Sequence, residues 1–185
     1  KPIIDPSQDV VLGIYYMSRE KVNAKGEGKI MSSVNEVNRA FYAGIVDVHA
    51  KIKVRLKPNN SAEEKSQLVD TTVGRALLFE LLPENMPFSL VDRTLDSKAV
   101  SNLIDVCYRK AGLKKTVIFA DQLMYMGYEH STRSGSSIGV NDFVIPEAKA
   151  SIVEASEKEV KAIAKQFESG LVTNGERYNK VIDIW

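Results

Sequence analysis

The sequence predicts an α+β fold, in which mixed helices and a small, mainly antiparallel sheet are followed by a protruding antiparallel helical hairpin. Residues 50–56 alternate between apolar and basic side chains, with the period of a β-strand. Ser33 and Ser97 each precede a segment whose apolar residues have helical spacing. Residues 146–185 contain two more such segments, one after the other. We therefore expect two domains, residues 1–145 and residues 146–185.

Composition limits the classes of protein to which the chain can belong. Its 185 residues are 44% hydrophobic, which is enough for a real core. The net charge of +1 creates no overall field that would attract a polyanion. The single Cys107 excludes an internal disulfide and fits a reducing compartment. No apolar stretch approaches the ~20 residues that span a bilayer, and no signal peptide is visible, so we expect a cytoplasmic protein.

The N-terminal part is predicted to begin with a helix capped by Ser7, which carries the apolar run 10–17. Gly13 lies inside this helix, where it costs about 1 kcal/mol relative to Ala, and indicates close approach by another backbone. Residues 23–29 contain a G-x-G pattern. Because the pattern lacks the G-K-[ST] ending of a phosphate loop, a surface loop is the favoured interpretation.

The next segments are predicted to be a short helix and two strands. Ser33 starts the helix, and Gly44 closes it. In the strand 50–56 three basic side chains share one face, and we favour a solvated face over a phosphate contact: Lys51, Lys53 and Arg55. Residues 71–82 are rich in β-branched and apolar side chains and are expected to form a strand. Arg75 interrupts this segment, and a charge there needs a partner.

Two successive helices are expected after the prolines at positions 83 and 87. Ser97 opens the first, which ends at Gly112 and places Cys107 in the core. The second follows at once, from residue 114 to about residue 126. Residues 134–139 then form a turn of small residues.

The hairpin is predicted from its spacing and its caps. The first arm has a 3-4-3-4 seam made of Val153, Ser156, Val160, Ile163 and Phe167. Gly170 suits a helix end with positive φ, and Thr173 with Glu176 forms a capping box that starts the second arm. That arm offers Tyr178, Val181 and Trp185. Because no cap follows Trp185 and Lys1 is not an initiating Met, we expect a segment of a longer protein with a truncated second helix.

The residues alone do not form a self-sufficient active site. There is no C-x-x-C, H-E-x-x-H, G-x-S-x-G or clustered Asp-x-Asp-x-Asp motif, so no catalytic residue, metal ligand or cofactor is expected. Two functions remain open on this basis. One is a free-standing protein-interaction module that presents the hairpin. The other is a small nucleotide-binding regulator.

Several stretches, in order along the whole chain, resemble one family. They are residues 6–13, 23–28, 71–75, 116–121, 133–135 and 166–185. Together they are similar to the β′ subunit of bacterial DNA-directed RNA polymerase, most of all to its proteobacterial form, and residues 167–180 are the most specific stretch. Residues 57–70 differ most and look shortened, as a surface loop permits.

The resemblance implies a position within a large nucleotidyltransferase. It places the chain in the pore and funnel that line the secondary channel, through which nucleotides enter and a backtracked RNA 3′ end is extruded. The family's catalytic loop Asn-Ala-Asp-Phe-Asp-Gly-Asp, which holds Mg²⁺, is absent here, and residues 141–143 are not a remnant of it. The chain is therefore expected to be inactive alone. Implied partners are the β, α and ω subunits and the rest of β′.

Site residues follow from the same resemblance. Gln8 matches a residue near the active centre, where its amide could bond a ribose or the RNA end; the alternative is a polar residue at a helix N-terminus. The hairpin matches a channel rim on which Glu176, Asn179 and Lys180 face cleavage factors of the Gre type, DksA and ppGpp.

A second ppGpp site, between β′ and ω, matches three residues of the helix after Gly112: Lys114, Asp121 and Tyr125. Lys114 could meet a phosphate, Asp121 could accept from guanine and Tyr125 could stack on it. The alternative is that Asp121 and Tyr125 face ω or a neighbouring helix.

Overall fold

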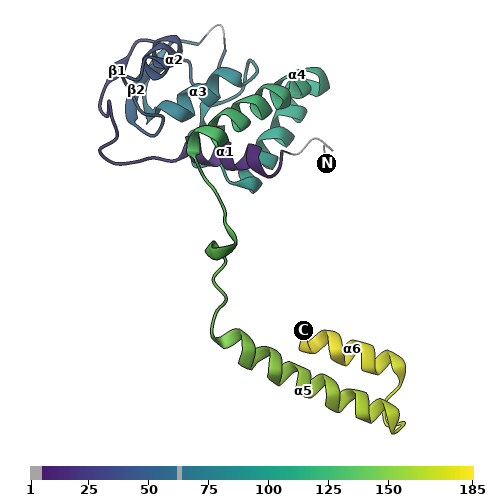
Figure 1. Ribbon diagram of the computed structural model, residues 1–185. Helices are drawn as coiled ribbons and strands as arrows, with labels where there is room; N and C mark the ends of the chain where they lie inside the picture. Colours follow the sequence, from purple (N-terminus) through teal and green to yellow (C-terminus); the bar gives the residue numbers. More distant parts are fainter. Residues whose placement is uncertain (1–5, 62–63) are drawn as a thin grey trace. The chain divides into compact units, whose positions relative to one another are not determined.

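A computed structural model describes residues 6–61 and 64–185 and divides the chain into two compact units (Figure 1). The first comprises residues 1–136 and the second residues 137–185. The first unit combines helices with a three-stranded sheet and the second is helical, so the α+β prediction is confirmed. The predicted domain boundary after residue 145 lies inside the second unit. No helix in the described part of the chain has the length and apolarity needed to cross a membrane.

The sheet has the order β1-β2-β3, formed by Ile30–Met31, Lys51–Leu56 and Gln67–Thr72. β2 and β3 pair antiparallel, whereas β1 pairs parallel to β2 with Ile30 opposite Lys53. The predicted alternation in β2 is confirmed, because its apolar side chains are buried and its basic ones exposed. Lys51 pairs with Glu20 at 3.0 Å and Lys53 with Asp70 at 3.4 Å. These ion pairs favour the solvated face over a phosphate contact.

The helix α1 (Asp9–Ser18) begins later than predicted. Its N-cap residue is Gln8, with φ 54° and ψ −125°, and no side chain caps it, so the assignment of Ser7 as the cap is wrong. The prediction for Gly13 is confirmed. A Cβ there would collide with the carbonyl oxygen of Gly127 in α4 and lie 2.7 Å from the Ser131 nitrogen.

The helix α2 (Val34–Tyr42) begins at its predicted cap, since the Glu36 backbone N–H donates to Ser33 Oγ at 3.3 Å. The helix ends at Tyr42, and Gly44 follows in a turn with φ 67°. Residues 23–29 lie outside any helix or strand, mostly exposed, as a surface loop should.

The predicted strand 71–82 is wrong beyond residue 72. Thr72 ends β3 and caps α3 (Val73–Leu81), accepting from the Arg75 backbone N–H at 3.4 Å. The run of apolar residues in this segment suits a buried helix as well as a buried strand, so periodicity alone does not separate the two. The hydroxyl of Thr72 and the tertiary packing select the helix.

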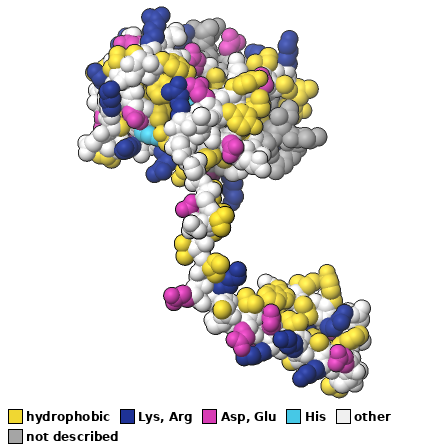
Figure 2. All heavy atoms as spheres, in the orientation of Figure 1, with side chains coloured by type: hydrophobic (Ala, Val, Ile, Leu, Met, Phe, Trp, Pro, Cys, Tyr) yellow, Lys and Arg dark blue, Asp and Glu magenta, His cyan; other side chains and the backbone are white. Residues whose placement is uncertain are grey.

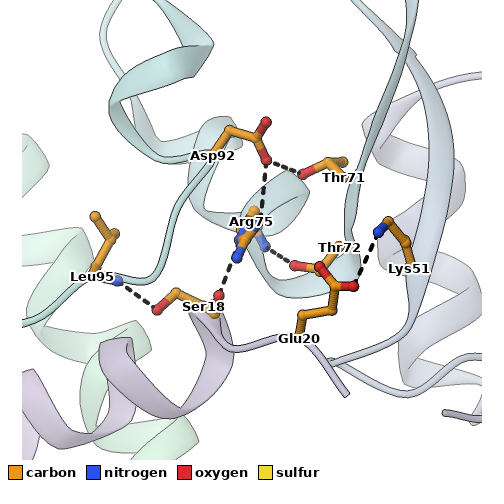
Figure 3. A network of polar contacts seen from close by, with 8 residues as sticks. All are labelled: Ser18, Glu20, Lys51, Thr71, Thr72, Arg75, Asp92 and Leu95. Atoms are coloured by element: carbon orange, nitrogen blue, oxygen red, sulfur yellow. Dashed lines mark hydrogen bonds and ion pairs between the residues drawn. The ribbon is translucent and has the colours of Figure 1, made fainter. Parts of the chain in front are cut away.

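Arg75 has the partners that its position requires (Figure 3). Its Nε donates to the backbone oxygen of Ser18 at 3.0 Å, and its guanidinium lies 3.6 Å from Asp92. Asp92 also accepts from the Thr71 hydroxyl at 2.7 Å, and the Leu95 N–H donates to Ser18 Oγ at 2.9 Å. The network therefore ties α1, β3 and α3 to the loop before α4.

The two predicted helices after Pro87 form α4 (Ser97–Ser134), which is broken at Gly112 with φ 80° and ψ 172°. A short 3-10 helix, η1 (Phe88–Leu90), precedes it. Ser97 is the first helical residue, and Asp96 provides the cap. Cys107 is buried, as predicted, and accepts from the Thr116 hydroxyl at 3.5 Å.

The second unit contains η2 (Val140–Asp142), α5 (Ala148–Glu168) and α6 (Asn174–Ile184). The five residues of the predicted seam of α5 are half-buried, Gly170 has φ 75°, and the capping box is present. The stripe predicted for the second arm is wrong except at Val181. Tyr178 and Trp185 are 65% and 68% exposed, while the half-buried residues of α6 are Arg177, Val181 and Ile184.

Arg177 explains why the half-buried face of α6 differs from the predicted one. Its guanidinium lies over the Phe167 ring, 4.6 Å from the centroid, and its Nη2 donates to Asn174 at 2.8 Å. A long cationic side chain can thus cover apolar surface that a sequence pattern assigns to Tyr178.

Candidate functional site

Gln8 lies at the start of α1 in a backbone conformation that residues other than glycine rarely adopt. Its backbone oxygen accepts the first helical bond, from Leu12 N at 3.0 Å. Its side chain is exposed and forms no hydrogen bond within residues 6–61 and 64–185. The amide therefore does not stabilise the helix as a cap, and it is available for an external partner.

Lys114, Asp121 and Tyr125 are brought to one exposed face of α4, after its break. The helical rise separates Lys114 from Asp121 by about 10 Å along the axis, so the two charges do not neutralise each other. None of the three side chains has an ion pair or a hydrogen bond among the described residues. Their polar groups face solvent.

The break at Gly112 gives Lys114 a particular electrostatic setting. The helix restarts immediately after Gly112, and the Thr116 hydroxyl donates back to the Gly112 oxygen at 2.9 Å. Lys114 therefore lies in the first turn of the restarted helix, where free backbone N–H groups and the helix dipole favour an anion. This setting suits a phosphate group.

Asp121 also lines a depression of about 320 Å³ between the start of α1 and α4. The other lining residues are Pro6, Ser7, Val10, Val117, Ala120, Met124 and Tyr128. Lys114, Tyr125 and Gln8 do not line it, although Ser7 precedes Gln8 directly. The sequence reasoning missed the apolar neighbours of Asp121. The signal was present in the 4-3-4 spacing of Val117, Asp121, Met124 and Tyr128.

Glu176, Asn179 and Lys180 share one exposed face of α6, but they differ in the hydrogen bonds that their side chains form. Glu176 accepts from the Thr173 N–H at 2.8 Å and from its hydroxyl at 2.9 Å. These bonds, helped by the charge of Lys180, lower the pKa of the Glu176 carboxyl. Asn179 and Lys180 form no hydrogen bond and no close ion pair among the described residues, although Lys180 lies near enough to Glu176 to act on its charge. Glu176 thus holds the helix start, and the other two are free to bind.

The described residues contain no group of His, Cys, Asp or Glu side chains that could hold a metal ion. Asp142 accepts from the Gly139 N–H at 2.7 Å and so stabilises η2. This contact gives Asp142 a local structural role.

Comparison with known proteins agrees with the residue pattern. Residues 1–143 match the family model described as RNA polymerase Rpb1, domain 3. The chain is 57% identical to the DNA-directed RNA polymerase subunit beta′ of Stutzerimonas stutzeri and 58% identical to that of Saccharophagus degradans, over 190 residues in each case. These alignments cover 100% of this chain and 14% of each relative. The resemblance inferred from the sequence is therefore confirmed, and the chain belongs to the family of the β′ subunits of bacterial DNA-directed RNA polymerase.

Proposed function

We propose that the chain lines the secondary channel of a DNA-directed RNA polymerase and provides docking surfaces there for channel-binding factors and ppGpp. The observation that carries the proposal is the match of 100% of the chain to β′ subunits. Asn179, Lys180, Lys114, Asp121 and Gln8 support it, because each is exposed and keeps polar groups that the fold does not use. The assembled enzyme would be cytoplasmic, and its Mg²⁺ would be held by β′ residues outside this sequence.

The exposed apolar side chains of residues 138–145 support assembly with other polymerase parts. Ile138, Val140, Phe143, Val144 and Ile145 are each at least 70% exposed, and Figure 2 shows hydrophobic side chains along this segment. Such a contiguous apolar stretch normally marks an interaction surface. The partners that we propose are the rest of β′ and the β, α and ω subunits.

The face of α6 that carries Asn179 and Lys180 is the proposed docking surface at the channel rim. An exposed amide and an exposed ammonium without hydrogen bonds among the described residues can bond a partner's backbone, a carboxylate or a phosphate. Partners of this chemistry include factors of the Gre type, DksA and the phosphates of ppGpp. Glu176 would act mainly by fixing the start of this helix.

Reconstituted polymerase carrying Asn179→Ala with Lys180→Ala tests the rim. We expect the response to a Gre-type factor or DksA to weaken about tenfold, with basal elongation close to normal, because only exposed groups are removed. Lys165→Ala is the matched control, since Lys165 is an exposed lysine of α5 that forms no ion pair among the described residues. A collapse of basal elongation would show that α6 has a structural role instead.

The face of α4 with Lys114, Asp121 and Tyr125 is the proposed ppGpp surface on the ω side. Lys114 and the restarted helix suit a phosphate, the Asp121 carboxylate can accept from the guanine edge, and the Tyr125 ring can stack on the base. The resemblance implies that arginines completing the phosphate contacts lie outside this sequence, so we expect the 185-residue chain to bind ppGpp weakly by itself.

Binding of labelled ppGpp to polymerase that contains ω tests this surface. Lys114→Ala and Asp121→Ala should each weaken binding about tenfold or more, since each removes a charged contact. Lys110→Ala is the control, because Lys110 is also exposed but precedes the break at Gly112. Unchanged affinity in both site variants would exclude ppGpp from this face and leave it as a contact with ω.

Gln8 is proposed to face the RNA 3′ end or a ribose in the assembled enzyme. Its strained backbone and free amide are what a residue held for an external contact should show. Gln8→Gly would relieve the strain and remove the amide. Slower elongation with unchanged or higher stability of the subunit is the expected result, and normal elongation would assign Gln8 to the helix start alone.

A further inference from the structure

A groove between β1 and α2 lies apart from the surfaces described above and has no role in the proposed function. It is open, has a volume of about 560 Å³, and we name it the β1–α2 groove. Its lining residues are Lys29, Ile30, Met31, Glu36, Arg39, Ala40, Ala43 and Ile45. Figure 1 shows β1 at the margin of the first unit with α2 beside it, and the two elements are in contact.

The main-chain N–H and C=O of Ile30, a lining residue of the groove, have no hydrogen-bond partner among the described residues. Lys53 N donates to Lys29 O at 2.9 Å, so the groups of β1 that face β2 belong to residues 29 and 31. In a parallel ladder the N–H and C=O of the residue between them point to the opposite side. That side is the free edge of the sheet, because β1 is its terminal strand among the described residues.

In the part of the chain that the structure describes, Ile30 is the one residue of this edge whose N–H and C=O are both unpaired. The Lys29 N–H donates to Gly26 O at 3.4 Å, and the Ser32 N–H donates to Glu36 at 2.6 Å. An extended segment laid along the edge would therefore form main-chain bonds at Ile30 alone. These bonds would fix its register, and side chains would have to supply most of the affinity.

Apolar surface in the groove suits such a segment. Ile30 is 67% exposed and Ile45 is 50% exposed. The neighbouring Ala43 adds a small side chain that lets a backbone approach closely. An aliphatic side chain on every second residue of the partner would cover the two isoleucines.

The charge of the groove is positive. Lys29 and Arg39 line it and have no ion pair among the described residues. Glu36, the one acidic residue of the lining, is already occupied, since the Ser32 N–H and hydroxyl both donate to it at 2.6 Å. These bonds lower the pKa of the Glu36 carboxyl. Glu36 stays ionised but its oxygens already accept bonds, so the lining has a net charge of +1 that favours a negatively charged partner.

We propose that the β1–α2 groove binds an extended acidic segment of a partner protein, with aliphatic residues alternating with Glu or Asp. The segment would bond the N–H and C=O of Ile30, pack on Ile30 and Ile45, and place carboxylates beside Lys29 and Arg39. An extended conformation follows from the strand edge, and the acidic character follows from the two unpaired cations.

Binding of a short, fluorescein-labelled peptide of alternating Val and Glu to the 185-residue chain tests the proposal by fluorescence anisotropy at low salt. Lys29→Gln and Arg39→Gln should each weaken binding about threefold to tenfold. Lys98→Gln should leave it unchanged, because Lys98 is exposed on α4 and has no partner among the described residues. Added salt should weaken binding of this peptide.

Two further peptides separate the contributions. A peptide of alternating Val and Lys should not bind, since it reverses the charge. The Val and Glu peptide with N-methylated amides should bind at least about threefold more weakly, because it cannot donate to the Ile30 carbonyl. Absence of binding by the acidic peptide, or equal losses in Lys98→Gln and Arg39→Gln, would overturn the proposal. A dimer in sedimentation that the acidic peptide does not dissociate would assign the groove to a second copy and would also overturn it.

Discussion

His130 is a buried residue whose Nδ1 has no hydrogen-bond partner in the part of the chain that the structure describes. Its ring lies 5.8 Å from the Phe41 ring, and Glu129 and Arg133 are its neighbours in α4. Burial lowers the pKa of His130 to about 4; Glu129 opposes this shift, while Arg133 and His49 add to it. The imidazole is therefore neutral in the folded protein at neutral pH.

Stability should depend on pH through this residue. The unfolded chain takes up the proton near pH 6.5, whereas the folded chain resists it until about pH 4. The free energy of unfolding should thus fall, by up to about 3 kcal/mol, as the pH drops from about 6.5 to about 4. Denaturation midpoints at several pH values measure this loss. His130→Leu should remove most of it above pH 4.5, and an unchanged pH dependence in that variant would contradict the assignment.

At the scale of elements, the first unit depends on a close crossing of α1 and α4. Gly13 faces the Gly127 carbonyl, and a Cβ on Gly127 would in turn lie 2.7 Å from Val10 O. Because neither glycine has a side chain, the backbones of α1 and α4 can approach each other closely at this point. The crossing brings the start of α1 beside Asp121, so it also shapes the depression between these helices.

Gly13→Ala should destabilise the first unit by about 3 kcal/mol or more, because its methyl group would force the two backbones apart. Urea denaturation, with hydrogen exchange of the α1 and α4 amides, measures the effect. Gly175→Ala is the control: nothing lies within 4 Å of its Cβ, so it should be neutral or slightly stabilising. Equal effects of the two changes would mean that helix propensity alone matters at Gly13.

The capping box is the second element-scale feature. Thr173 Oγ1 accepts from the Glu176 N–H at 3.3 Å, while Glu176 accepts from Thr173. Thr173→Ala should weaken the start of α6 by about 1 kcal/mol, and so speed exchange of the α6 amides about fivefold. Ser151→Ala is the control, since its hydroxyl bonds only to Ala148 O inside α5. Exchange that is equally slow in both variants would show that the box does not stabilise α6.

At the scale of the whole molecule, membership in the β′ family does not by itself say which chemistry the residues of this chain perform. The chain spans 14% of the length of the curated relatives that it matches. It has no Asp-x-Asp-x-Asp motif, and its described residues contain no candidate metal cluster.

The purified chain should incorporate no nucleotide when it is given template, nucleotides and Mg²⁺. The physical reason is that phosphoryl transfer by two metals needs clustered carboxylates to hold them. Extension of a labelled primer is the measurement, with intact polymerase as the positive control. Extension that persists after repurification, stops when a chelator is added and returns when Mg²⁺ is restored would contradict this expectation.

Much of the fold and part of the site could be predicted from local pattern. Ser33, Gly112 and the Thr173–Glu176 pair each fix a helix end through their own backbone or side-chain bonds, and the alternation of 51–56 orients β2. The site residues came from the family resemblance. The resemblance identified these residues from the sequence. The exposure of Asn179, Lys180, Lys114 and Asp121 agrees with a binding role without testing it.

By itself, then, the sequence determined the α+β class, the family, and the helix ends and strand faces that local bonds specify. Tertiary structure decided the rest. It turned residues 73–81 into a helix, placed Gln8 in a positive-φ conformation, and selected Arg177 over Tyr178 against Phe167. It also paired Gly13 with Gly127 and left the edge of β1 open above α2. The helix 73–81 combines a local cap, Thr72, with tertiary packing, whereas the glycine pair and the Arg177–Phe167 contact join different elements, which no local pattern specifies.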